Sequence, residues 1–140
     1  MTYTTLDALR TRFGEVQLIQ LTDRAGAGVV DVATVNQELA NTDATINAAL
    51  AVRYQLPLAT VPAVVSGIAL AIAIYKLHVY ACDPKIKDDY DQALKDLDAI
   101  ATGKRKLDVA GIEPTTNGAG GVMATDRERP ITPETMHGYI

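Results

Sequence analysis

An uncharged run from Leu56 to Tyr75 is the feature that most constrains how this chain folds. The run approaches the length of a membrane-spanning helix, but only its second half is strongly apolar. Four residues also interrupt its apolar character: Pro57, Pro62, Ser66 and Gly67. In the stretch "VVSGIALAIAIYKLHVY" the apolar residues surround the helix axis, as expected of a helix that other helices enclose. The run therefore predicts a buried helix and no membrane span.

This central helix is expected to have Pro62 in its first turn and to reach about Ala81. Its alternating alanines, Ala69, Ala71 and Ala73, permit neighbouring helices to approach closely. Tyr75 and Tyr80 are predicted to be core aromatics, because no basic groove accompanies them as it would in a platform for stacked bases.

Two short helices are expected before the central one. The stretch "TTLDALRTRFG" has apolar residues at intervals of three and four, and Thr4 and Asp7 have the spacing of a capping box. A first helix should therefore start near Thr5 and end at the glycine. The stretch "EVQLIQL" predicts a second helical turn with Leu18 and Leu21 facing inward.

The clearest amphipathic pattern runs from Val32 to about Tyr54 and follows Asp31, which suits a helix N-cap. Its predicted inward stripe consists of Val32, Val35, Leu39, Thr42, Ile46 and Leu50.

A further helix is marked at both ends. Asp83 suits the N-cap, Pro84 the first helical position and Gly103 the C-terminal cap. On its solvated face Asp91 and Lys95 have the spacing of a supportive ion pair. Its predicted inward face consists of Ile86, Tyr90, Ala93, Leu97 and Ile100.

These patterns predict an all-α fold, a small bundle of about five helices around the central apolar helix, formed by residues 1–107. Residues 108–140 are expected to form an extended C-terminal arm, because they hold five of the ten glycines and three of the six prolines without sustained periodicity. Such a segment can reach roughly 100 Å at about 3.3 Å per residue, enough to cross onto a neighbouring chain. Its isolated apolar residues are predicted to order on binding a partner: Val109, Ile112, Val122, Met123, Ile131, Met136, Tyr139 and Ile140.

Composition excludes some classes of function. The net charge of −4 argues against tight, sequence-independent binding to duplex DNA, which needs many contacts from Lys and Arg to phosphates. The single cysteine, Cys82, excludes an internal disulfide framework and favours a reducing compartment. No secretory signal is expected, because the opening residues carry Asp7 and lack an apolar run.

The stretch "LTDRAGAGVVD" has the outline of a calcium loop in which Asp23 would be the first ligand. Ala25 and Ala27 occupy the next two ligand positions, and Thr34 stands where a bidentate Glu is needed. We therefore interpret this stretch as a turn and no metal site. The residues assigned to the turn and the following helix cap are Asp23, Gly26, Gly28 and Asp31.

No catalytic or cofactor-binding constellation is evident. His78 and Cys82 stand four residues apart on the predicted central helix, which superficially resembles part of a zinc or nucleophile site, but partners are missing. We interpret both as packed structural residues and predict that the protein is not an enzyme and binds no cofactor. An enzyme that uses them would need a third group supplied by the fold.

A basic trio, Lys104, Arg105 and Lys106, follows the last predicted helix. Positive charge there complements the exposed carbonyls of the helix end, although the trio could also contact nucleic acid or an acidic protein patch. The alternative class is thus a small helical DNA-binding regulator, with Arg127 and Arg129 as further phosphate contacts.

Three stretches resemble one family of proteins: "YTTLDALRTRFGEVQLIQLTDRAGAGVVD", "INAALAVRYQLPLATVP" and "YDQALKDLDAIATGK". Over roughly residues 3–107 the chain resembles the Mu-like phage head-to-tail connector family, small helical proteins of the virion neck. That family often has additional acidic residues in the glycine-containing turn, where this chain has Ala25 and Ala27.

The resemblance implies a structural virion protein that joins capsid to tail at the neck and is assembled in the host cytoplasm. It implies a homo-oligomeric ring of twelve copies, with the portal protein above it and tail-side neck or tail terminator proteins below. Genomic DNA would pass through the lumen without sequence-specific binding, and no membrane is involved. The arm would contact the portal or the adjacent subunit.

Overall fold

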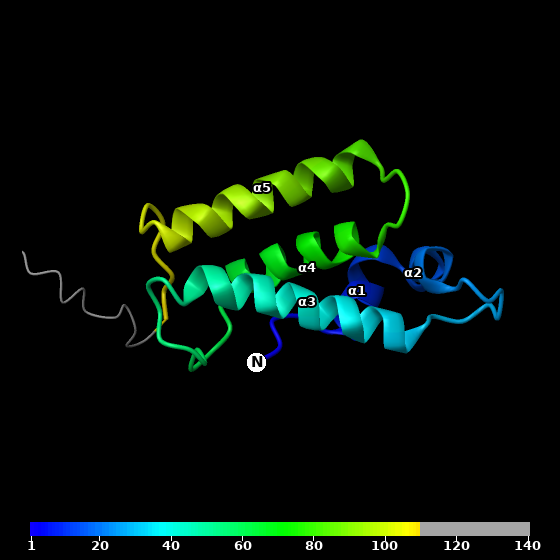
Figure 1. Ribbon diagram of the computed structural model, residues 1–140, viewed down its shortest axis with the longest axis horizontal. Coiled ribbons are helices and arrows are strands. Elements are labelled where there is room, and N and C mark those ends of the chain that lie inside the picture. The colour runs from blue at the N-terminus through cyan, green and yellow to red at the C-terminus, as the bar shows by residue number, and fades with distance from the viewer. Residues whose placement is uncertain (110–140) are drawn as a thin grey trace, which may run out of the picture.

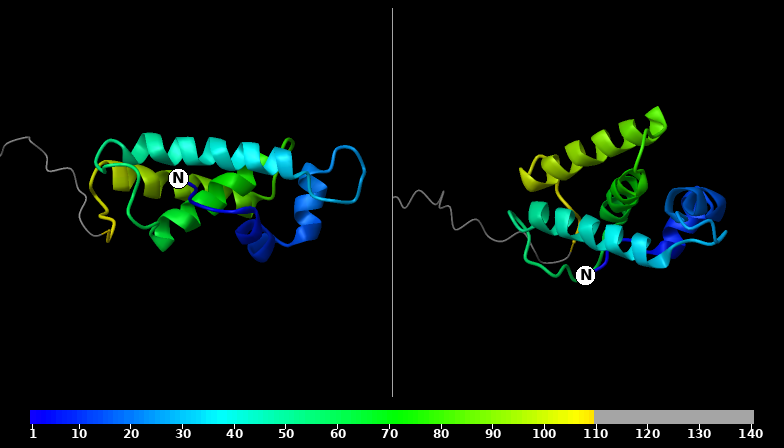
Figure 2. Two further views of the ribbon diagram at one scale, coloured as in Figure 1. Left: turned by 90° about the horizontal axis from the view of Figure 1, so that it is seen from below. Right: turned by 45° about the vertical axis from the view of Figure 1, so that its right-hand side comes forward.

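The computed structural model describes residues 1–109 as five helices with no strand among them (Figure 1). The helices are α1 (Leu6–Phe13), α2 (Glu15–Thr22), α3 (Val32–Leu50), α4 (Ala63–Leu77) and α5 (Pro84–Ala101). The three long helices lie side by side, and the two short ones sit together at one end (Figure 2). The predicted all-α bundle is confirmed. Within the described part of the chain, no helix has the length and hydropathy to cross a membrane.

Helix α4 is central because it contributes to both apolar clusters of the body. Its residues up to Ile72 pack with α3 and α5, in a cluster that includes Ile46 and Leu97. Its second half packs with α1, α2 and the start of α3, in a cluster that includes Leu9 and Val35. Seven side chains of α4 are buried, as predicted for a helix that is apolar all round.

The helix termini follow the predicted chemistry with one exception. Asp83 accepts the N–H of Lys85 at 2.8 Å at the start of α5, and Gly103 adopts a positive φ of 78° just after its end. The predicted capping box from Thr4 to Asp7 is not formed, because Thr4 is buried and the hydroxyl of Thr5 caps α1 instead.

Two of the three long helices were predicted to extend further than they do in the structure. Helix α3 stops at Leu50 and α4 at Leu77, several residues before the expected Tyr54 and Ala81. Tyr80 therefore leaves the helix and is 90% exposed, so its assignment to the core is wrong. The inward assignment of Val32 is also wrong, because its side chain is 47% exposed on a side of the first turn of α3 that no other described element covers.

Two tyrosines and an ion pair refine the expected face of α5. Tyr90 is half-buried and stacks on Tyr75 of α4, with 4.0 Å between ring centroids and 12° between planes. Asp91 bonds to Lys87, one turn earlier, at 3.1 Å, and this pair replaces the expected pair with Lys95.

Substitution by alanine should change the stability in opposite directions at two glycines, Gly103 after the end of α5 and Gly67 within α4. Gly103→Ala is expected to lower the free energy of unfolding by about 1 to 2 kcal/mol, because its φ of 78° disfavours a side chain. Gly67→Ala, in α4, is expected to raise it by about 0.5 to 1 kcal/mol, since its added Cβ meets nothing within 4 Å. Urea unfolding followed by circular dichroism measures both. Equal effects of the two substitutions would contradict the assigned backbone conformations.

Candidate interaction surfaces

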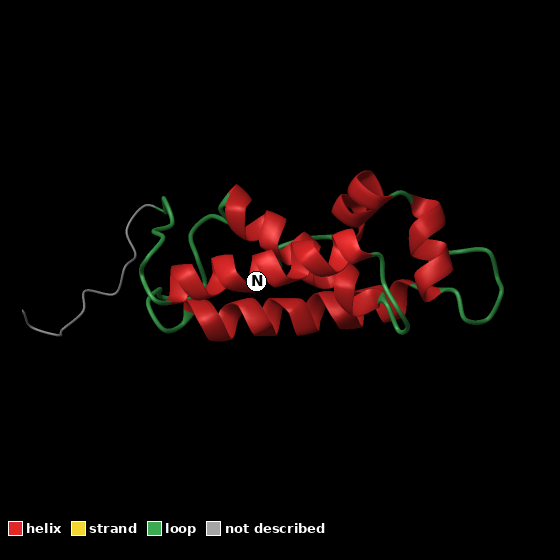
Figure 3. Cartoon of the chain, turned by 90° about the horizontal axis from the view of Figure 1, so that it is seen from above, coloured by secondary structure: helices red, strands yellow, loops and turns green. Residues whose placement is uncertain are grey.

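The loop between α2 and α3 projects beyond the bundle in every view (Figure 3). The carboxylate of Asp23 accepts the N–H of Ala27 at 2.9 Å and of Gly28 at 2.6 Å. Gly26 and Gly28 both have a φ of 73°, a left-handed conformation that favours glycine. The loop is thus held by its own hydrogen bonds while it extends away from the body.

Where the loop enters α3, Asp31 is the N-cap. One carboxylate oxygen accepts the N–H groups of Ala33 (3.1 Å) and Thr34 (3.4 Å), and the other accepts the Thr34 hydroxyl at 2.6 Å. The buried Thr22 hydroxyl accepts the N–H of Asp31 at 3.1 Å and donates to the carbonyl of Leu18 at 2.7 Å. These bonds tie the end of α2 to the start of α3.

The same bonds shift the acidity of both carboxyls. The N–H of Gly28, followed by that of Ala27, lowers the pKa of Asp23 by stabilising its charged form. The Thr34 hydroxyl, the largest cause, lowers the pKa of Asp31. Both carboxylates thus bind protein donors, which is the geometry of a turn and a cap. Among residues 1–109 no group of three or more His, Cys, Asp or Glu is placed to hold a metal ion.

Large apolar side chains are exposed at the end of the bundle that carries this loop. Val29 is 61% exposed beside Val32, and Val79 and Tyr80 lie exposed in the α4–α5 loop at the same end (Figure 1). Tyr80 and Val79 share a hollow with Arg24, which places the two loops next to each other. We call Val29, Val32, Val79 and Tyr80 the apolar end. Sequence reasoning missed it because periodicity indicates which residues face inward, and not whether another element covers them.

The predicted helical pair of His78 and Cys82 does not exist as such. Because α4 ends at Leu77, His78 is its C-cap, and its Nδ1 lies 2.7 Å from the carbonyl oxygen of Ile74, to which it donates. Cys82 is half-buried in the loop and packs against the cluster around Leu9. The two side chains therefore lie in different local environments and do not form a pair.

The basic trio lies exposed after α5. The backbone N–H of Arg105 donates to the carbonyl of Ala99 at 3.0 Å, and its guanidinium is 3.6 Å from Asp96. Arg105 is thus directed back onto α5, whereas Lys104 and Lys106 follow the helix end on either side of it.

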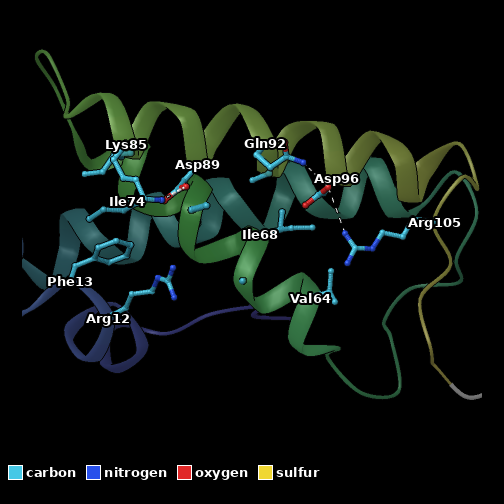
Figure 4. A pocket seen from close by; sticks show the side chains of 14 residues that line it. Arg12, Phe13, Val64, Ile68, Ile74, Lys85, Asp89, Gln92, Asp96 and Arg105 are labelled. Carbon is cyan, nitrogen blue, oxygen red and sulfur yellow. Dashed lines mark hydrogen bonds and ion pairs between the residues drawn. The ribbon is translucent and has the colours of Figure 1, made fainter.

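A groove between α1, α4 and α5 was not anticipated from the sequence (Figure 4). It has a volume of about 370 Å³, an apolar floor and a charged rim. Ion pairs lie along the α5 side of the rim, between Lys85 and Asp89 (2.6 Å) and between Arg105 and Asp96 (3.6 Å). The floor includes Val64, Gly67, Ile68, Ala71, Ile74 and Ala93, and Arg12 and Phe13 of α1 close one end. We call it the α4–α5 groove.

Of the arm residues singled out from the sequence, only Val109 is described, and it is half-buried. The other seven lie outside the described residues: Ile112, Val122, Met123, Ile131, Met136, Tyr139 and Ile140.

The described body is a small all-α protein whose distinctive features are a projecting loop, an apolar end and a groove. Comparison with known sequences is consistent with this class and specifies the family. The chain matches the family described as "Bacteriophage Mu, Gp36" over residues 3–125, and it belongs to that family.

Two curated relatives match the chain along its length. The "Mu-like prophage FluMu protein gp36" of Haemophilus influenzae is 28% identical over 138 residues, which cover 99% of this chain and 98% of that protein. "Gene product J" of Escherichia phage Mu is 25% identical over 141 residues, with complete coverage of both. This is therefore a Mu-like phage protein, and none of these names denotes an enzyme.

The loop should loosen in acid with a midpoint set by Asp23. Since folding lowers the pKa of Asp23, its stabilising effect is complete above its ordinary value near 3.8 and disappears as the pH falls through the lower folded value. An NMR titration of the Asp23 carboxyl should give a midpoint below 3.8, with the amide signals of Ala27 and Gly28 moving in parallel. In the Asp23→Asn variant, the amide signals of Ala27 and Gly28 should no longer shift with that midpoint. A midpoint at or above 3.8 in the unaltered chain would contradict the bonding scheme.

Proposed function

We propose that this protein is a head-to-tail connector subunit, which forms a ring beneath the portal and joins the capsid to the tail of a Mu-like phage. Membership of the family supports a phage role. The observation that carries the connector role is the projecting α2–α3 loop, which is ordered by internal hydrogen bonds and yet exposes Val29, with Val32 exposed in the first turn of α3 directly after it.

An ordered loop with exposed valines is suited to docking on another protein. Because the Asp23 carboxylate already holds the backbone through the N–H groups of Ala27 and Gly28, less conformational freedom remains to be lost on binding. Fully burying a valine contributes about 1.5 to 3 kcal/mol. Val79 and Tyr80 are exposed in the α4–α5 loop at the same end of the subunit, so that this end offers a second apolar contact for the portal or a tail-side neck protein.

The proposed ring contains twelve copies in head-to-tail contact around a closed rotation, with DNA passing through its lumen. The net charge of −4 suits a channel that does not retain DNA. A DNA-binding regulator is less well supported, because Arg105 of the basic trio is directed to Asp96 of its own subunit.

A charge placed on the loop should weaken attachment to the portal-containing particle. Val29→Asp is expected to reduce incorporation into particles about tenfold or more, because desolvating a carboxylate replaces burial of a valine. The matched control is Val52→Asp, since Val52 is 70% exposed and lies at the other end of α3. Quantitative mass spectrometry of purified particles measures incorporation. Equal incorporation of both variants would argue against a docking role for the loop.

Removal of the arm should separate folding from assembly. A chain truncated after Leu107 is expected to stay soluble and helical, since within the described residues 1–109 the apolar clusters are formed by residues from Tyr3 to Leu107. It should nevertheless fail to join portal-containing particles, because the arm residues are missing. Circular dichroism checks the fold, and co-sedimentation with particles checks assembly. Normal attachment of the folded, truncated chain would remove the arm from the proposal.

A further inference from the structure

Gly67 lies in the α4–α5 groove, and nothing within the described part of its own subunit requires a glycine at this position. It lies inside α4, at the fifth position, and glycine in a helix interior costs about 0.5 to 1 kcal/mol relative to alanine. Its backbone is helical and does not need glycine, and an added Cβ would meet nothing within 4 Å. The missing side chain therefore leaves open space above the groove floor, which another polypeptide can enter closely.

The charge around this space distinguishes it from the rest of the molecule. Three basic residues and two acidic residues line the groove, a balance of +1, whereas the whole chain carries −4. The apolar floor between them, with Ile68 and Ile74, suits apolar side chains of an occupant. The groove thus favours a segment that combines isolated apolar residues with a net negative charge.

We propose that the α4–α5 groove is the docking site for residues 110–140 of a neighbouring copy of this chain, with Val122 and Met123 against its floor. This segment has four acidic and two basic residues, a net charge of −2. Gly120 and Gly121 precede the apolar pair and permit close backbone approach to Gly67. The family match extends through residue 125 and so includes this pair.

The segment is long enough to extend past its own subunit and reach the groove of a neighbouring copy. The chain leaves the body beside the groove wall formed by Arg105, where the N–H of Leu107 donates to the Tyr54 hydroxyl at 3.1 Å. From Val109, the thirteen residues to Val122 can span about 43 Å at about 3.3 Å each. The whole of α5, with 18 residues, is only about 27 Å long at about 1.5 Å per residue. The reach therefore suits the next subunit of a ring, and to that extent the inference rests on the proposed function.

Cross-linking between full-length copies tests the contact directly. One copy carries Gly67→Cys and a second, with a distinguishable mass, carries Met123→Cys, both with Cys82→Ala to remove the native thiol. After mild oxidation of the mixture, the two masses should appear joined by a disulfide, at a yield about tenfold above the control in which Val16→Cys replaces Gly67→Cys. Val16 is a suitable control because it is 70% exposed and lies outside the groove. Yields equal to the control would overturn the proposal.

A single chain that carries both Gly67→Cys and Met123→Cys separates the two possible origins of the segment. Joined copies should form in a concentration-dependent manner. A disulfide formed only within one chain, with a yield independent of concentration, would overturn docking on a neighbour.

Filling the groove gives a second, independent test. Gly67→Phe should reduce self-association of the otherwise unaltered chain about tenfold, because the phenyl group takes the space of the incoming residues, whereas Gly67→Ala, which adds only one methyl group, should reduce it less. Sedimentation velocity measures association, and circular dichroism verifies that both variants are folded. Equal association of the two folded variants would overturn the docking site. Attachment to portal-containing particles is measured separately in the loop and truncation experiments, so failure of the connector role is distinguishable from failure of this contact.

Discussion

The all-round burial of α4 is the constraint on which the rest of the body depends. A helix that is apolar on every side is stable in water only when neighbours enclose it, and α4 takes part in both apolar clusters. Helices α3 and α5 flank it along its length, while α1 packs against its second half. The N-terminal segment adds to this enclosure, since Tyr3 is buried and its backbone N–H donates to Asp43 of α3 at 3.0 Å. The arrangement of the bundle follows from the need to cover one helix.

The periodic part of this arrangement was predictable from the sequence. Val35, Leu39, Ile46 and Leu50 face the core because their spacing places them on one side of a helix that packs along its length. The same spacing misassigned Val32, since a residue that points inward is buried only where a neighbouring helix reaches it. Helix ends were overestimated for a related reason: they depend on tertiary contacts beyond the periodic stretch, and apolar content alone continues past Leu77.

The candidate surfaces also differ in whether local sequence patterns could predict them. The turn was readable because its chemistry is local: Asp23 bonds to amides four and five residues away, and Asp31 caps the helix that directly follows it. The groove was not readable, because its walls come from three helices far apart in the sequence and from Arg105 after the last of them. Its one sequence signal is Gly67, and a glycine within an apolar helix becomes informative only when the structure shows that no neighbour fills its space.

The loop and the groove share one physical feature, which is that apolar groups are exposed on an ordered backbone. Apolar burial around α4 stabilises the body, whereas the α2–α3 loop is held by polar bonds from Asp23 and Thr22. Because Val30 is buried and polar bonds hold the rest of the loop, Val29 can be exposed without loss of structure. In the groove it is the missing side chain of Gly67 that leaves the apolar floor open. Both surfaces thus present apolar groups on an already ordered backbone, which would allow a partner to bind without refolding of the subunit.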